Sequence, residues 1–122
     1  MATDSIYHVE NLTRQQPLAT QALLANESRT RREGLLKRSG LEPGEGLLIT
    51  PCEAIHTFGM KFAIDVVFIG KDRKVRKLMH AVPRNRIGFC FSSEIVLELP
   101  AGAAQQTGTV VGDQLELRKL SK

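Results

Sequence analysis

The chain has 122 residues, of which 42% are apolar and 25% charged, and its formal net charge is +4. This composition is too apolar for a disordered chain, so we expect residues 1–122 to form a single domain that needs no disulfide or metal to fold. No apolar stretch is long enough to span a membrane, and the first residues lack the basic and apolar regions of a signal peptide. These features predict a cytoplasmic protein with no membrane partner.

The first part of the chain predicts one edge strand and one ambiguous segment. Residues 5–10 alternate loosely between apolar and polar side chains, as a short edge strand does. Residues 19–26 form a short apolar run that suits a helix as well as a strand, because periodicity does not separate the two over so few residues.

A helix is expected next, from about residue 29 to residue 39. Ser28 or Thr30 can cap its first turn, and Glu33 lies three residues after Thr30, as in a capping box. The leucines of the sequence TRREGLLKR would face inward, and Gly40 suits the position that follows the end of a helix.

The remainder of the sequence has a β pattern. Gly44 and Gly46 bracket a turn before an apolar run, and a turn at residues 70–73 joins the most apolar segment to a basic one, which predicts a hairpin. One helical turn is expected at residues 103–108. The expected strands are residues 47–49, 62–69, 74–82, 94–100 and 114–120. These elements predict a mainly β, α+β domain: a small two-layer antiparallel β-sandwich or open barrel with one or two short helices.

Five motifs occur in an order that resembles the domain-of-unknown-function 192 (DUF192) family. They are RREGLLKR, EGLLI, HTFGMKFAIDVVFI, VLELPAG and VGDQLEL, and they define a family-like core over residues 29–117. The resemblance implies a small β-rich two-layer sandwich with short helices, and it implies no settled activity. The family usually has an aromatic residue directly before its central methionine, whereas this chain has Gly59 before Met60 and adds Cys52 and His56 upstream.

The densest group of chemically active side chains lies in residues 51–65, PCEAIHTFGMKFAID. A thiol, an imidazole, a thioether and a carboxyl occur together there, at Cys52, His56, Met60 and Asp65. We predict that these four side chains bind a ligand in a concave site, with a small molecule or a peptide segment of a partner as the ligand. This interpretation needs no catalytic residue, metal or cofactor.

Two alternatives use the same residues. Cys52 could act as the nucleophile of a hydrolase or transferase, with His56 as its base and Asp65 as the orienting group. Cys52, His56 and Met60 also form a soft ligand set that suits copper better than zinc. The ordinary interpretation is that His56 is a core or rim histidine and that Cys52 and Cys90 are reduced thiols that pack as small apolar groups.

Three acidic residues have unusual settings. Asp65 lies inside an apolar run, where it is either a buried anchor that accepts hydrogen bonds from a loop, from Arg32 or from Arg38, or a group that contacts the ligand. Glu98 presents the same choice less strongly, because strand alternation could turn it outward. Asp113 follows a glycine and is expected to stabilise a tight turn by accepting main-chain hydrogen bonds.

Basic residues gather at residues 29–38, 71–77 and 84–86. If these stretches share a face, they could form an electropositive patch that meets phosphate. However, the net charge is small, and the five phenylalanines lie mostly in apolar runs rather than between basic residues. We therefore do not expect nucleic-acid binding, and we interpret the basic hairpin as a solvated edge.

Overall fold

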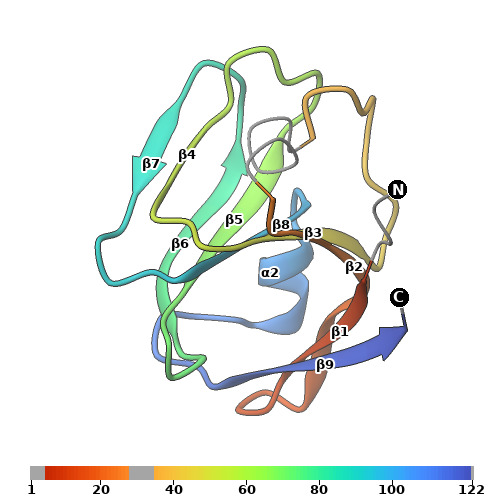
Figure 1. The fold of residues 1–122 in the computed structure, drawn as a ribbon, viewed down its shortest axis with the longest axis vertical. Helices are drawn as coiled ribbons and strands as arrows, with labels where there is room; N and C mark the ends of the chain where they lie inside the picture. The colour runs from red at the N-terminus through yellow and green to blue at the C-terminus, as the bar shows by residue number, and fades with distance from the viewer. Residues whose placement is uncertain (1–4, 28–34, 122) are drawn as a thin grey trace.

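Nine strands and one short helix make up the part of the chain that the structure, a computed structural model, describes: residues 5–27 and 35–121 (Figure 1). The elements are β1 (Ile6–Asn11), β2 (Gln16–Ala25), β3 (Glu45–Ile49), β4 (Ala54–His56), β5 (Ile64–Ile69), β6 (Val75–Val82), β7 (Ile87–Phe89), β8 (Ile95–Pro100), α2 (Ala103–Thr107) and β9 (Leu115–Ser121). The predicted mainly β fold is confirmed. Within these residues, no helix has the length and apolar character that crossing a membrane would require.

Seven strands form one strongly curved sheet in the order β6-β5-β8-β3-β2-β1-β9, and β4 and β7 form a separate two-stranded sheet. Every neighbouring pair is antiparallel except β2–β3. Register shifts in β1–β2 and β5–β6 increase the bending of the sheet. Its edge strands approach each other at an isolated bridge between Lys74 and Gln114, where Leu115 N donates to Arg73 O at 2.9 Å. The result is an open barrel.

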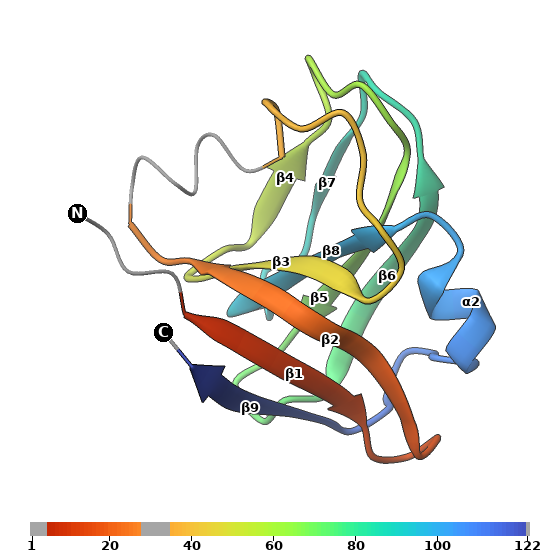
Figure 2. The same cartoon turned by 90° about the vertical axis from the view of Figure 1, so that its right-hand side faces the viewer.

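The inner face of the curved sheet carries an apolar core. Its buried members come from all seven strands of that sheet: Val9, Leu18, Ala19, Ala22, Leu48, Val67, Ile69, Val75, Ile95, Leu97, Leu99 and Leu115. The helix α2 packs against β2 and β8 at one end of the curve, while β1 begins and β9 ends at the other (Figure 2). One end of the barrel is therefore covered and the opposite end is open.

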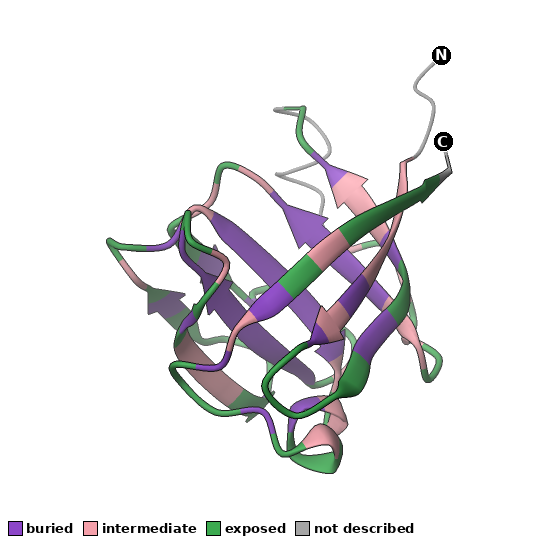
Figure 3. Ribbon diagram, turned by 90° about the horizontal axis from the view of Figure 1, so that it is seen from below, coloured by how far each residue is buried: buried purple, intermediate pink, exposed green. Residues whose placement is uncertain are grey.

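The outer face of the sheet carries a second core beneath β4, β7 and the loop between β4 and β5. The central strands β5 and β8 are consequently buried on both faces, which explains why their sequences are apolar almost throughout (Figure 3). Glu98 is buried along with them. The expectation that strand alternation turns Glu98 outward to solvent is wrong. Glu98 is only 6% exposed, because the outer face of β8 is covered by the second core.

Most of the predicted strands are present, and the ambiguous apolar segment belongs to the strand β2. The helix predicted from residue 29 begins within residues 28–34, which lie outside the described part of the chain; residues 35–37 form a turn, in which Leu35 is buried. The strands β4 and β7, of three residues each, were not predicted. Both are too short to give a period, and Pro51 and Gly59 favoured a loop around β4.

Asp113 stabilises the turn that leads into β9, as predicted. Its Oδ2 accepts hydrogen bonds from Asn11 Nδ2 at 3.0 Å, from Arg14 Nε at 2.9 Å and from Val110 N at 3.1 Å. Gly112 provides the left-handed backbone of this turn, with φ 98°. One carboxylate thus joins the β1–β2 hairpin to the segment before β9.

Replacing Asp113 by asparagine is expected to lower the free energy of unfolding by about 1–2 kcal/mol at neutral pH. Burial acts to raise the pKa of Asp113, but the hydrogen bonds from Arg14 and Asn11 outweigh it and the pKa lies below its usual value. This stabilisation is therefore present above the unfolded-state pKa and is lost as the pH falls through the folded-state pKa. Urea unfolding at pH 7, 5 and 3 should show the difference between the two proteins shrinking at pH 3; a constant difference would contradict the assignment.

Candidate functional site

The four residues predicted as a ligand site occupy different environments. Cys52 is half-buried, and its Sγ donates to Ala54 O at 3.2 Å. His56 is exposed on β4, whereas Met60 is 4% exposed and packs in the second core. Asp65 is fully buried at the second position of β5. The structure therefore does not gather these four side chains into one site.

Asp65 is surrounded by main-chain donors. Its Oδ1 accepts from Ala81 N at 2.8 Å, and its Oδ2 accepts from Gly102 N at 3.1 Å and Ala104 N at 3.0 Å. The carboxylate therefore supplies the acceptor at the start of α2 and also fixes the end of β6, where Ala81 has a positive φ of 47°. This geometry matches the interpretation of Asp65 as an anchor for loop N–H groups.

The arginines considered as partners of Asp65 lie elsewhere or are not described. Arg38 Nη2 donates to Glu45 Oε1 at 2.9 Å, and Arg32 lies outside the described residues. Glu98 is the other buried acid of the central strands. Its cross-strand neighbours Leu47 and Val66 are apolar, and burial raises the pKa of Glu98 to about 7.

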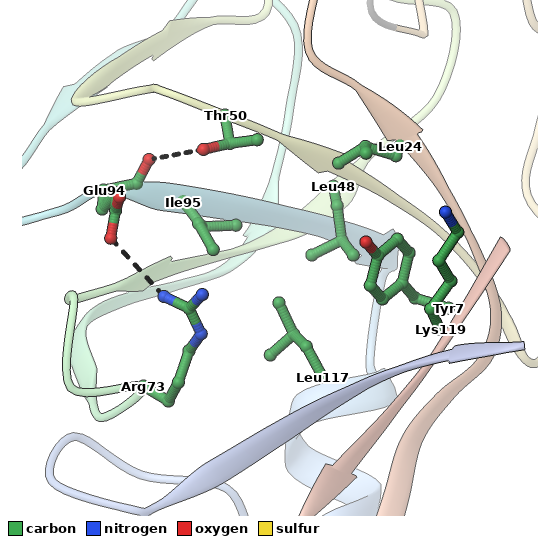
Figure 4. Close-up of a pocket in the computed structure, with 9 residues that line it drawn as sticks. All are labelled: Tyr7, Leu24, Leu48, Thr50, Arg73, Glu94, Ile95, Leu117 and Lys119. Atoms are coloured by element: carbon green, nitrogen blue, oxygen red, sulfur yellow. Dashed lines mark hydrogen bonds and ion pairs between the residues drawn. The ribbon is translucent and has the colours of Figure 1, made fainter. Parts of the chain in front are cut away.

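A cavity of about 440 Å³ lies at the open end of the barrel, away from α2 (Figure 4). Its floor is apolar and its rim is polar. The lining residues come from six separate segments of the chain: Tyr7, Leu24, Leu48, Thr50, Arg73, Glu94, Ile95, Leu117 and Lys119. Apolar cavities at the mouths of barrels are a common place for ligands.

Strand geometry explains how this cavity is built. Leu117 and Lys119 are two residues apart and share one face of β9, and Tyr7 on β1 is the cross-strand partner of Lys119. Leu115, on the same face of β9, is buried in the inner core. The face thus changes along the strand from core leucine to cavity leucine to a lysine at the rim.

The rim carries two cations and one acid. Arg73 Nη1 lies 3.5 Å from Glu94 Oε1, a long ion pair whose side chains are 40% and 38% exposed. Thr50 Oγ1 donates to the main-chain oxygen of Glu94 at 3.4 Å (Figure 4). Lys119 lies beside Tyr7 at the other end of the cavity. A rim with one net positive charge favours a ligand with an anionic group.

A second hollow, of about 490 Å³, adjoins the first and shares Glu94 with it. It is lined by Pro51, Cys52, Glu53, Ala54, Lys71, Ser93 and Glu94. Of the four residues predicted from sequence, Cys52 lines this hollow and His56, Met60 and Asp65 line neither cavity. Among the described residues, no group of three or more His, Cys, Asp or Glu side chains is arranged to hold a metal ion.

The polar groups that line the first cavity are the hydroxyls of Tyr7 and Thr50, the carboxylate of Glu94, and the cations of Arg73 and Lys119. Tyr7, Arg73, Glu94 and Lys119 are not recognisable as a group in the sequence, because strand pairing brings them together and their spacing along the chain does not. The sequence feature that could have indicated the cavity is the position of Leu117 and Lys119 on one face of the last strand, and this is a weak indication.

The comparisons with known proteins agree with this fold. The DUF192 family model, described as "Uncharacterized ACR", matches residues 9–117. A solved structure from Sinorhizobium meliloti 1021, provisionally described as a transcription regulator, has a TM-score of 0.81 at 22% identity, covering 94% of each chain. One from Novosphingobium aromaticivorans DSM 12444, of unknown function, has a TM-score of 0.78 at 20% identity, covering 94% of this chain and 93% of that one. No curated protein matches the chain.

Proposed function

The chain belongs to the DUF192 family, and from that premise we propose that it is a non-catalytic domain that binds a small amphipathic anion in the cavity at the open end of its barrel. The observation that carries the proposal is the combination of an apolar floor with a cationic rim. A volume of about 440 Å³ lies within the range of small-molecule sites, roughly 300–1,000 Å³.

The cavity supports a particular orientation of the ligand. An apolar chain would contact Leu48, Ile95 and Leu117, and its acidic head would meet Lys119. Arg73 is already paired with Glu94, so Lys119 is the cation better suited to a new partner. The Tyr7 hydroxyl, on the strand paired with Lys119, supplies a further donor for the same head group.

The residues predicted from sequence enter this proposal in different ways. Cys52 lines the adjoining hollow, and we propose it as a contact for a ligand that extends past Glu94. Met60 packs in the second core and Asp65 anchors α2 at the opposite end of the barrel, so neither residue contacts a ligand in this cavity. His56 belongs to a different surface, on the small sheet of β4 and β7.

The test is a titration of isotopically labelled protein with decanoate, followed by amide chemical shifts. We expect saturable shifts at the amides of Tyr7, Leu24, Ile95 and Leu117, and weaker binding of decanol and decylamine because they lack the anionic head. Replacing Leu117 by tryptophan fills the cavity and should weaken decanoate binding tenfold or more. Replacing Lys119 by glutamine should weaken decanoate binding about threefold and leave decanol binding unchanged.

The same strand offers matched controls. Leu120→Trp and Arg118→Gln change exposed residues of β9 that do not line the cavity, and each should leave decanoate binding unchanged. The proposal fails if decanoate produces no saturable shifts up to millimolar concentration. It also fails if the shifts persist unchanged in the folded Leu117→Trp variant.

A further inference from the structure

The small sheet of β4 and β7 carries a run of exposed aromatic and apolar side chains on its outer face. We call it the aromatic row and define it as His56, Phe58, Ile87, Phe89 and Phe91. Phe58 is 47% exposed, Ile87 64%, Phe89 52% and Phe91 80%. Exposure of this much contiguous apolar surface indicates an interaction site.

Strand alternation explains why these side chains share one face. Ile55 and Gly88 are the buried, central residues of β4 and β7, so the flanking residues of both strands point outward. His56 is the cross-strand partner of Ile87. Gly88 lies on the inner side, where an added side chain would meet the end of the Met79 side chain of β6 and displace it.

Ring contacts extend the row beyond the two strands. The rings of His56 and Phe58 are stacked, with centroids 5.5 Å apart and planes at 28°. At the other end, the rings of Phe89 and Phe91 lie 5.1 Å apart. Within β7, Ile87 and Phe89 are two residues apart, roughly 7 Å at the rise of a strand.

Cations flank both ends of the row. Buried Thr57 holds the loop before β7: its Oγ1 donates to Pro83 O at 2.7 Å and accepts from Arg86 N at 2.8 Å. Arg84 and Arg86 are exposed in this loop, and Arg86 directly precedes Ile87 of the row. At the far end, Lys77 Nζ lies 5.6 Å from the centroid of the Phe89 ring.

The charge of this region is larger than that of the whole chain. Residues 51–92 contain eight Lys and Arg against three Asp and Glu, a net charge of +5, whereas the chain carries +4. Two of those acids are already engaged: Asp65 is buried, and Asp72 Oδ2 accepts from Arg76 Nη2 at 2.7 Å. Arg73 and Arg76 of this segment are likewise paired, with Glu94 and Asp72, so the cations considered beside the aromatic row are Lys77, Arg84 and Arg86.

We propose that the aromatic row binds single-stranded nucleic acid, with bases stacked on its exposed rings and phosphates facing Arg84, Arg86 and Lys77. Exposed aromatic rings next to cations are the two features that such binding uses. A duplex would hide its base faces from the rings, and a second copy of this chain would bring like charges together. The sequence disfavours nucleic-acid binding because the net charge is small and the phenylalanines lie mostly in apolar runs. In the structure, however, three of the five phenylalanines are exposed on this one surface.

The experiment measures fluorescence anisotropy of labelled dT12 and rU12 with the full chain in 50 mM salt. We expect dissociation constants of about 10–100 µM, and weaker binding to a 12-base-pair duplex. Phe89→Ala and Phe91→Ala should each weaken single-strand binding about tenfold. Val111→Ala and Leu120→Ala, which remove exposed apolar side chains elsewhere, are the matched controls and should have no effect.

Salt dependence tests the cations separately from the rings. Arg84→Gln should reduce the slope of log K against log salt by about 0.7, the value for one phosphate contact with a single strand. The control is Arg118→Gln on β9, which should leave the slope unchanged. Far-ultraviolet circular dichroism confirms that each variant is folded, and decanoate binding should be the same in all of them, because the row shares no lining residue with the cavity.

Three results would overturn the proposal: no binding of either oligonucleotide at 1 mM protein, equal binding of duplex and single strand, or affinity that does not change in Phe89→Ala and Phe91→Ala. Vesicles of phosphatidylcholine with 20% phosphatidylserine provide one further arm. Sedimentation of the protein with these vesicles, lost in the phenylalanine variants while oligonucleotides do not bind, would assign the surface to a membrane instead.

Discussion

Replacing Asp65 by asparagine is expected to lower the free energy of unfolding by about 3 kcal/mol, a large loss for an isosteric change. The carboxylate accepts three main-chain hydrogen bonds, and hydrogen bonds to a charged group contribute about 1.5–3 kcal/mol each. An asparagine has one oxygen and one NH2 group, so it must present a donor to Ala81 N or to the two donors of α2. Urea unfolding at neutral pH measures the loss.

The position of the damage distinguishes an anchor from a general core residue. Loss of the anchor should speed hydrogen exchange at the amides of Ala81, Gly102 and Ala104 more than at β1 or β9. Asp72→Asn is the control, because its exposed carboxylate pairs with Arg76 in solvent and its loss should change stability little. If the Asp65→Asn protein were as stable as the wild type, the three hydrogen bonds to the carboxylate would not contribute to stability and the prediction would be wrong.

The same residue illustrates how far the sequence leads. An acid inside an apolar run predicts a buried, hydrogen-bonded carboxylate, because an unpaired charge in that position would be too costly. Its donors were not predictable: they come from positions 16 to 39 residues further along the chain, and their N–H groups are free because α2 starts and β6 bends there. The local sequence therefore predicts that the Asp65 carboxylate is hydrogen-bonded, whereas the tertiary structure determines which N–H groups donate to it.

The strands were predictable for a related reason. The segment from residue 62 to residue 69 is apolar without alternation, which is typical of a strand covered on both faces, and β5 is fully buried. The curvature of the sheet was not predictable, since it depends on register shifts in β1–β2 and β5–β6. That curvature creates the cavity between Tyr7, Glu94 and Lys119, so the proposed site was hidden from sequence analysis too.

The residues predicted as a ligand site are dispersed because spacing along the chain does not determine distance in space. Cys52, His56 and Met60 are four residues apart, but they lie before, on and after the short strand β4, where neighbouring positions face different sides. His56 faces solvent, while Met60 packs under the same sheet. A three-residue strand is enough to separate side chains that a helix would have placed together.

Replacing Glu98 by glutamine is expected to raise the free energy of unfolding by about 3 kcal/mol at pH 8 and to change it little at pH 4. Burial raises the pKa of Glu98 to about 7, from an ordinary value of 4.5. The folded state therefore binds the proton more tightly than the unfolded state does. The stability this gives is fully present below about pH 4.5 and is lost as the pH rises through 7. The size of the effect follows because a tenfold difference in proton affinity between the two states corresponds to about 1.4 kcal/mol.

Urea unfolding of both proteins at pH 4, 6 and 8 checks this directly, and a carbon-detected titration of the Glu98 carboxyl gives its pKa. Glu116→Gln removes a carboxyl from the exposed face of β9 and is the matched control. A difference between wild type and Glu98→Gln that is the same at pH 4 and pH 8 would show that Glu98 is hydrated in the folded protein.

The titration of Glu98 also reports on the layer that covers it. Glu98 lies between Leu47 and Val66, and these pack in the second core with Ile55 of β4 and Met60. If β4 and β7 separated from the large sheet, water would reach the carboxyl and its pKa would fall toward 4.5. A pKa near 7 in the presence of saturating oligonucleotide would therefore mean that the aromatic row binds without moving, as a surface held rigidly on the sheet beneath it.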